Sequence, residues 1–219
     1  HMRFRRQRQM CIRDRLQRAS IKNCQNLSKK VDIQKNMIEV IKTTLDGCFL
    51  FKPKKIKDNR GYFFESYRTR WFFDIIKENV QFVQDNQSFS RYGTIRGLHF
   101  QKPPFQQAKL VRAVVGSVLD TVLDLRAESK TFGKTFSIEL SSDNNIQLYI
   151  PKGFAHGFSV LSETAIVCYK CDQYYSAEHE SGINPLDEDL KIDWRISKDN
   201  RMISKKDKKH QSFKEFKNE

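Results

Sequence analysis

From Ile38 onward, short apolar runs alternate with groups of turn-forming residues along most of the chain. The runs are rich in the β-branched and aromatic side chains that strands favour, and Gly, Pro, Asn and Asp separate them. We expect strands over residues 38–43, 48–52, 61–67, 82–88, 94–100, 109–115, 117–125, 135–140, 146–150, 154–161 and 164–171. Many short strands with almost no helix between them predict an all-β fold, an antiparallel sandwich or barrel of about ten strands.

Two stretches depart from this pattern. Residues 69–78 place Phe72, Ile75 and Ile76 at helical spacing after Thr69, a candidate N-cap, so we expect one short helix there. Residues 116–124 are almost continuously apolar, which predicts a strand buried between two sheets.

The net charge of +14 is concentrated at the two ends of the 219-residue chain. Residues 1–37 hold 11 Lys and Arg against 2 Asp and Glu, and residues 198–219 hold 8 against 4, which leaves 38–197 nearly neutral. A nucleic-acid-binding domain is expected to carry its basic patch on the folded surface, so we expect no nucleic-acid partner. We interpret 1–37 as a basic extension, a tag, leader or non-native segment. Residues 38–207 form one domain in this interpretation, and 208–219 a charged tail.

Hydropathy and cysteine usage indicate a cytoplasmic protein. The sequence has no run of about 18 apolar residues, so we expect no membrane span, and the basic N-terminus has no apolar stretch behind it as a secretory signal would. Five cysteines form an odd, unevenly spaced set, which favours reduced thiols. Cys168 and Cys171 lie on a predicted strand, where residues three apart face opposite sides, so we expect them to form neither a disulfide nor a joint metal site.

Two histidines lie in glycine-bearing strand contexts, His99 in 96–101 and His156 in 151–158. Simple alternation places Arg96 and Leu98 on one face and Gly97 with His99 on the other, where the missing side chain of Gly97 would leave room for a ligand. The pattern around His156 resembles the second half of the motif of metal-binding cupins. The first half should supply further histidines, and residues 116–124 contain none, so we expect a cupin-like barrel without metal.

Proton chemistry is the alternative to a metal site, and His99 is the candidate base because histidine is the side chain best suited to proton transfer near neutral pH. Lys109 begins the strand that follows the His99 loop, Tyr169 lies on the last long predicted strand, and Asp207 lies in the polar C-terminal segment. From the pattern alone these three are equally well a solvated lysine, a core aromatic and a helix cap.

The ordered segments of residues 38–207 together resemble the dTDP-4-dehydrorhamnose 3,5-epimerase family. The matching segments are 58–67, 82–86, 95–101, 109–111, 124–126, 150–158, 169–170 and 204–207. The resemblance implies a cupin-type jelly roll that works as a homodimer without metal or organic cofactor. It also implies epimerisation at C3 and C5 of a dTDP-linked 4-keto-6-deoxy sugar, as in dTDP-L-rhamnose biosynthesis for O-antigen.

The resemblance also implies roles for individual residues. His99 is then the base, paired with Asp207, Lys109 stabilises the oxygen anion at C4, and Tyr169 returns a proton to the opposite face. Substrate-binding roles carry over to Arg60, Glu65, Gln84, Asn86, Arg96, His156, Glu180 and Lys206. Two alternatives remain open from the sequence: an idle cupin that only binds a sugar nucleotide, and an epimerase that acts at one carbon of a related keto sugar.

Overall fold

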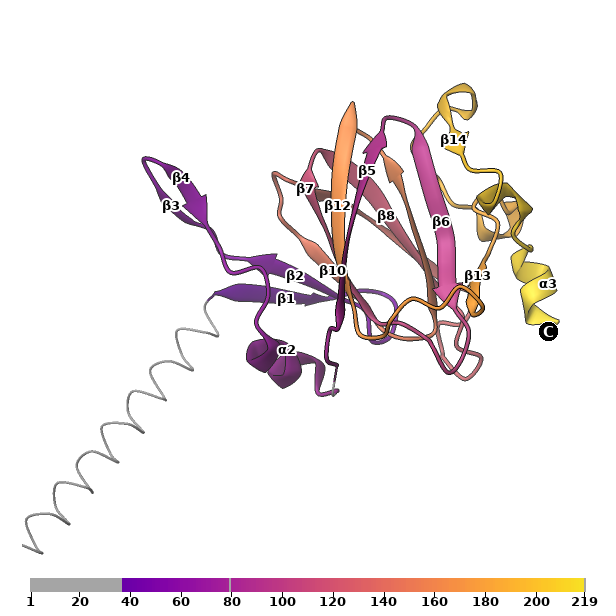
Figure 1. Ribbon diagram of the computed structural model, residues 1–219, viewed down its shortest axis with the longest axis horizontal. Helices are drawn as coiled ribbons and strands as arrows, with labels where there is room; N and C mark the ends of the chain where they lie inside the picture. Colours follow the sequence, from indigo (N-terminus) through magenta and orange to yellow (C-terminus); the bar gives the residue numbers. More distant parts are fainter. Residues whose placement is uncertain (1–36, 79, 219) are drawn as a thin grey trace, which may run out of the picture. The chain divides into compact units, whose positions relative to one another are not determined.

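A computed structural model describes residues 37–78 and 80–218 (Figure 1). The chain divides into two compact units, and the described part of the smaller one consists of residues 37–38 and 54–65. The larger unit holds residues 39–53 and 66 onward. The proposed basic extension lies outside the described residues except for Met37. Within the described part of the chain, no helix is long and apolar enough to cross a membrane.

Two sheets form the larger unit and confirm the all-β prediction (Figure 1). The first sheet has six strands in the order β1 (Ile38–Lys42), β2 (Phe49–Pro53), β10 (Gln147–Ile150), β7 (Lys109–Val115), β12 (Thr164–Cys171) and β5 (Gln84–Arg91). The second has the order β13 (Glu180–Gly182), β6 (Thr94–Gln101), β11 (Phe154–Val160), β8 (Ser117–Asp124) and β9 (Thr135–Ser141). Neighbours such as β12 and β5 run antiparallel, whereas β14 (Met202–Ile203) runs parallel to β6.

The main core lies between the facing sides of these two sheets. It contains Val111, Leu148 and Val167 from the first sheet together with Val122 and Phe158 from the second. Core residues of the same strand lie at alternate positions, such as Val111 and Ala113 on β7, as expected where one face of each strand is buried. The alternation therefore fixes which side chains enter the space between the sheets.

The C-terminal segment covers the other face of the second sheet. Its apolar residues Trp194 and Phe213 pack against Leu98 and Leu123 of that sheet. The segment consists of the short helices η1 (Glu188–Leu190), η2 (Lys198–Asn200), η3 (Asp207–Lys209) and α3 (Phe213–Lys217). Because both faces of the second sheet are covered, β8 is buried as the fourth of its five strands. The prediction of a buried strand here is confirmed, but β8 lies between the first sheet and the C-terminal segment rather than between two sheets.

Residues 208–218, interpreted from sequence as a charged tail, are folded in the structure. Ser212 and Glu215 form a reciprocal capping box at the start of α3, and Phe213 is buried against the second sheet. One aromatic residue thus anchors a segment whose composition is otherwise polar.

The short elements between β2 and β5 differ in part from expectation. The predicted turn at 58–61 joins β3 (Ile56–Asp58) to β4 (Gly61–Phe63), so the strand predicted over 61–67 ends early. The predicted helix is α2 (Thr69–Ile76), which buries Phe72 and Ile76. Thr69 is its first helical residue rather than its cap; Arg68 occupies the cap position, and its side chain does not cap the helix.

A buried carboxylate holds the loop after β8. Asp124 is fully buried and accepts hydrogen bonds from Arg126, Ser129 and Thr131 at 2.6–2.9 Å. Burial by itself raises the pKa of Asp124, but these hydrogen bonds outweigh it and lower the pKa from 3.8 to about 2. The ionised form therefore stabilises the fold above pH 3.8, and this contribution is lost as the pH falls through about 2.

We expect Asp124→Asn to lower the free energy of unfolding at pH 7. The difference in this free energy between wild type and variant, here called the gap, should narrow by about 2 kcal/mol between pH 7 and pH 2. The gap narrows because the wild-type carboxylate becomes protonated while asparagine does not titrate. Chemical denaturation at several pH values measures this difference. Asp74→Asn, at an exposed position of α2, is the matched control. A gap that stays constant with pH would contradict this role of Asp124.

Candidate active site

A pair of facing glycines brings together the two strands that carry histidines. A side chain at Gly97 would place its Cβ 2.6 Å from Cα of Gly157, and one at Gly157 would lie 2.5 Å from the carbonyl oxygen of Arg96. No side chain fits at either position, so the backbones of β6 and β11 approach closely. His99 and His156 are direct partners across this strand pair.

This arrangement corrects two expectations about Gly97. Backbone atoms of Gly157 fill the space beside it, so Gly97 does not open room for a ligand. Its φ of 117° also interrupts the alternation of β6. Ile95 and Leu98 consequently both belong to the apolar cluster between the second sheet and the C-terminal segment. Arg96 and His99 line one pocket together.

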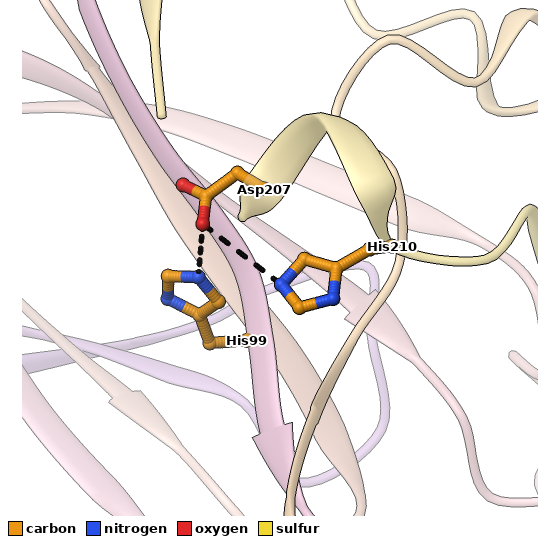
Figure 2. A group of neighbouring side chains, drawn as sticks. All are labelled: His99, Asp207 and His210. Carbon is orange, nitrogen blue, oxygen red and sulfur yellow. Dashed lines mark hydrogen bonds and ion pairs between the residues drawn. The ribbon is translucent and has the colours of Figure 1, made fainter. Parts of the chain in front are cut away.

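His99 forms an ion pair with Asp207 across 108 positions of sequence (Figure 2). Its Nε2 lies 2.9 Å from Oδ1 of Asp207, whose Oδ2 accepts a hydrogen bond from the backbone of Gly97. Burial raises the pKa of Asp207, but the hydrogen bond and charge of His99 outweigh it and hold this pKa below its ordinary value. Asp207 therefore stays ionised and accepts the Nε2 hydrogen, which leaves Nδ1 as the basic nitrogen of His99.

A second pair of this kind lies deeper, between His156 of β11 and Asp120 of β8. Nε2 of His156 is 2.9 and 3.0 Å from the two carboxylate oxygens of Asp120, and both side chains are buried. Asp120 was not among the predicted site residues, because metal-ligand spacing draws attention only to the absence of histidines from 116–124. The available signal was a carboxylate inside an apolar run, because a buried charge needs a partner.

The inner face of the first sheet carries the other proposed residues in two neighbouring rows. Lys109 and Gln84 flank Cys171 in one row, and Asn86 is the partner of Tyr169 in the next. Nε2 of Gln84 donates a 3.0 Å hydrogen bond to Asn86. Register thus brings together residues from three strands that are far apart in sequence.

Burial shifts the titration of the groups on this face. It lowers the pKa of Lys109 and raises the pKa of Tyr169. Burial by itself also raises the pKa of Glu180, but hydrogen bonds from Lys206 and Tyr175 outweigh it and lower this pKa.

Glu180 accepts hydrogen bonds from Nζ of Lys206 and from the hydroxyl of Tyr175. The nearby Glu178 is exposed, whereas Glu180 lies on β13 beside β6. Tyr175 was not singled out from sequence, because it lies in a polar loop with no periodicity.

Arg96 bridges the two sheets at one edge. Its guanidinium donates hydrogen bonds to Oγ of Ser90 and to the carbonyl of Phe89, both on β5. Burial raises the pKa of Tyr169, and the positive charge of Arg96 partly offsets this increase.

Arg60 and Glu65 belong to the separate unit of residues 54–65. Arg60 is highly exposed and forms an ion pair with Asp58 at 2.6 Å. Their part in substrate binding stays a prediction.

Comparison with known proteins identifies the family. The family model described as dTDP-4-dehydrorhamnose 3,5-epimerase matches residues 42–215. A curated dTDP-4-dehydrorhamnose 3,5-epimerase of Shigella flexneri is 45% identical over 176 residues, which cover 80% of this chain and 96% of the relative. The chain belongs to the dTDP-4-dehydrorhamnose 3,5-epimerase family. The family match reaches residue 215, beyond the end of the resemblance seen in the sequence.

Solved structures of the family share the fold. The crystal structure of the Elizabethkingia anophelis epimerase is 46% identical, has a TM-score of 0.79, and covers 82% of this chain and 98% of its own. A Legionella pneumophila relative, solved in complex with dTDP-4-keto-L-rhamnose, is 40% identical with a TM-score of 0.77, and covers 80% of this chain and 92% of its own. These similarities confirm the cupin-type fold expected for the family.

We expect Gly157→Ala to lower both the melting temperature and the affinity for dTDP. The added methyl group collides with the Arg96 carbonyl on β6 and forces apart the strands that carry His99 and His156. Thermal unfolding and calorimetric titration with dTDP measure the two effects. Ser137→Ala, on neighbouring β9, is the control, because it removes only the hydroxyl contact with Thr121. Unchanged melting and binding in Gly157→Ala would show that the glycine pair does not hold the site.

Proposed function

We propose that this protein epimerises C3 and C5 of dTDP-4-dehydro-6-deoxy-D-glucose and releases dTDP-4-dehydro-L-rhamnose. Family membership and the relative in complex with dTDP-4-keto-L-rhamnose support the substrate class. The observation that carries the reaction type is the His99–Asp207 pair, with Lys109 and Tyr169 on neighbouring rows of the inner face of the first sheet.

The reaction begins with removal of a proton next to the C4 ketone. Nδ1 of His99 takes this proton, since its Nε2 hydrogen is already donated to Asp207. The ionised carboxylate fixes the ring tautomer and stabilises the imidazolium that forms.

Loss of the proton leaves an enolate with its negative charge on the C4 oxygen. Lys109 is the cation assigned to this oxygen, and its burial makes each electrostatic interaction stronger than in water. By analogy with one donor of an oxyanion hole in an acyl-transfer enzyme, this interaction contributes about 3–4 kcal/mol. The burial that lowers the pKa of Lys109 also makes an alkaline loss of activity set in below the ordinary pKa of lysine.

Inversion requires that the new proton arrive from the other side of the sugar. His99 belongs to the second sheet and Tyr169 to the inner face of the first, which supports proton donation from the side opposite to the base. Because burial raises the pKa of Tyr169, the phenol keeps its proton at neutral pH and is able to donate it.

Binding of the nucleotide is assigned to polar groups of the larger unit. Arg96 suits the pyrophosphate because a guanidinium binds phosphate oxygens in pairs. Glu180, Lys206, Gln84, Asn86 and His156 supply hydrogen-bonding groups for the sugar and base. Arg60 and Glu65, in the smaller unit, are proposed as binding residues from the family resemblance alone.

We also propose a homodimer, a cytoplasmic location and a role in dTDP-L-rhamnose supply for O-antigen synthesis. β5, an edge strand of the first sheet, carries exposed apolar side chains along its length and at both ends: Val83, Phe89 and Tyr92. These side chains support a second copy of the chain at this edge.

Turnover in deuterium oxide tests the reaction directly. We expect the wild type to place deuterium at both C3 and C5 of the product, read by NMR, because each carbon passes through an enolate. His99→Ala should lose about 100- to 10,000-fold in exchange rate at both carbons while still binding dTDP, since it lacks only the base. His179→Asn, in the loop before β13, is the matched control.

Label at a single carbon would contradict double epimerisation and favour a mono-epimerase. Binding of dTDP without exchange in the wild type would indicate a sugar-nucleotide binder that lacks activity.

A further inference from the structure

A third side chain, His210, completes a compact cluster with His99 and Asp207 (Figure 2). It follows η3 directly, and its ring meets the His99 ring edge to face at a centroid distance of 5.6 Å. The ring also packs on Gly182, where a Cβ would lie 2.5 Å from it. His210 is therefore held by backbone and ring contacts, and the proposed reaction gives it no task.

The donor atoms of the three side chains converge. Nε2 of His99 and Nε2 of His210 lie 2.9 and 3.9 Å from the same Oδ1 of Asp207, and all three atoms are within 4.8 Å of one another. Nε2 of His210 is buried and has no hydrogen-bond partner among the described residues. A buried polar atom without a partner is costly, and this one points to a ligand.

The spacing fits a metal ion. Zinc takes nitrogen and oxygen ligands at about 2.0–2.2 Å, which places neighbouring donors of a tetrahedral site about 3.3 Å apart. Small rotations of the two imidazoles bring the observed separations to that value. We propose that His99, Asp207 and His210 bind a divalent transition-metal ion such as Zn²⁺, and that the ion inhibits the enzyme.

The charges around the cluster are mixed, and the adjoining pocket gives an ion access. Lys206 is ion-paired with Glu180, whereas Arg96, Arg201 and Lys208 line the same pocket as Asp207. The carboxylate of Asp207 is therefore the group that attracts the ion. His99 and Asp207 line an open pocket of about 550 Å³, and the His99 side chain is 32% exposed. Water from this pocket completes the coordination.

Inhibition follows from the tautomer of His99 and rests on the proposed function. An ion on Nε2 takes the place of the hydrogen donated to Asp207, and the neutral ring then carries its proton on Nδ1. That nitrogen is the proposed base, so it has no lone pair left for the substrate. Nε2 and Nδ1 face different sides of the imidazole ring, so an ion on Nε2 leaves the Nδ1 side open, and we expect dTDP still to bind.

This site differs from the metal site that the sequence analysis considered and set aside. That site would use His156, which is paired with Asp120. The new cluster depends on His210 instead, in a segment without a sequence motif.

Direct titration with Co²⁺ and Zn²⁺ tests binding without any need for turnover. We expect one Co²⁺ per wild-type chain, with the visible absorption bands of imidazole-bound cobalt, and displacement by Zn²⁺. Loss of an outer-shell partner typically weakens metal binding about 10- to 100-fold, and His210→Asn, which loses a direct ligand, should lose at least about 100-fold. His210→Phe is the second variant and keeps a ring on Gly182. His179→Asn is the matched control, because it removes an imidazole from outside the cluster and should bind like the wild type.

Activity is then measured with and without Zn²⁺ within each variant. Zn²⁺ should abolish turnover of the wild type and of His179→Asn without weakening dTDP binding, and both His210 variants should resist it. Equal binding in wild type and His210 variants would overturn the proposal, because the ion would then lie elsewhere. Failure of the wild type to bind would overturn it too. Binding without any turnover, in the absence of metal as well, would contradict the proposed function while leaving the metal site intact.

Discussion

The close approach of Gly97 and Gly157 is the constraint on which the arrangement of the site depends. A Cβ at either position would collide with the backbone of the opposite strand, so only glycine permits β6 and β11 to lie at this distance. The same contact makes His99 and His156 direct neighbours. It also interrupts the alternation of β6, so that Arg96 faces the pocket with His99. One backbone contact therefore sets the direction of three functional side chains.

Buried charge is the second constraint on the site, and at two places a histidine is paired with a carboxylate. Each histidine of the site has its own carboxylate, Asp207 for His99 and Asp120 for His156. A pair of this kind avoids the cost of an unpaired buried charge and fixes the ring tautomer. Lys109 differs, because burial lowers its pKa and its ammonium group has no hydrogen-bond partner among the described residues. A desolvated cation of this kind is suited to an anion that exists only during the reaction.

Much of the fold could be predicted from sequence because it rests on local patterns. Alternating apolar residues placed the long strands, and the spacing of Phe72 and Ile76 placed α2. The direction of side chains on β6 could not be predicted, because it depends on the positive φ of Gly97. Asp120 and His210 were missed because their partners come from other elements. The fold of 208–218 depends on Phe213 reaching the second sheet, a contact that composition does not reveal.

The roles of Lys109 and Tyr169 came from resemblance to the family, since their pattern alone equally fits a surface lysine and a core aromatic. The central claim of the account is that a base and an acid act from opposite walls, and Tyr169→Phe in deuterium oxide tests it most directly. The account predicts that this variant still exchanges substrate hydrogen for deuterium through His99, with the original configuration retained, while inversion falls by at least about 100-fold. Inverted product formed at the wild-type rate would contradict it.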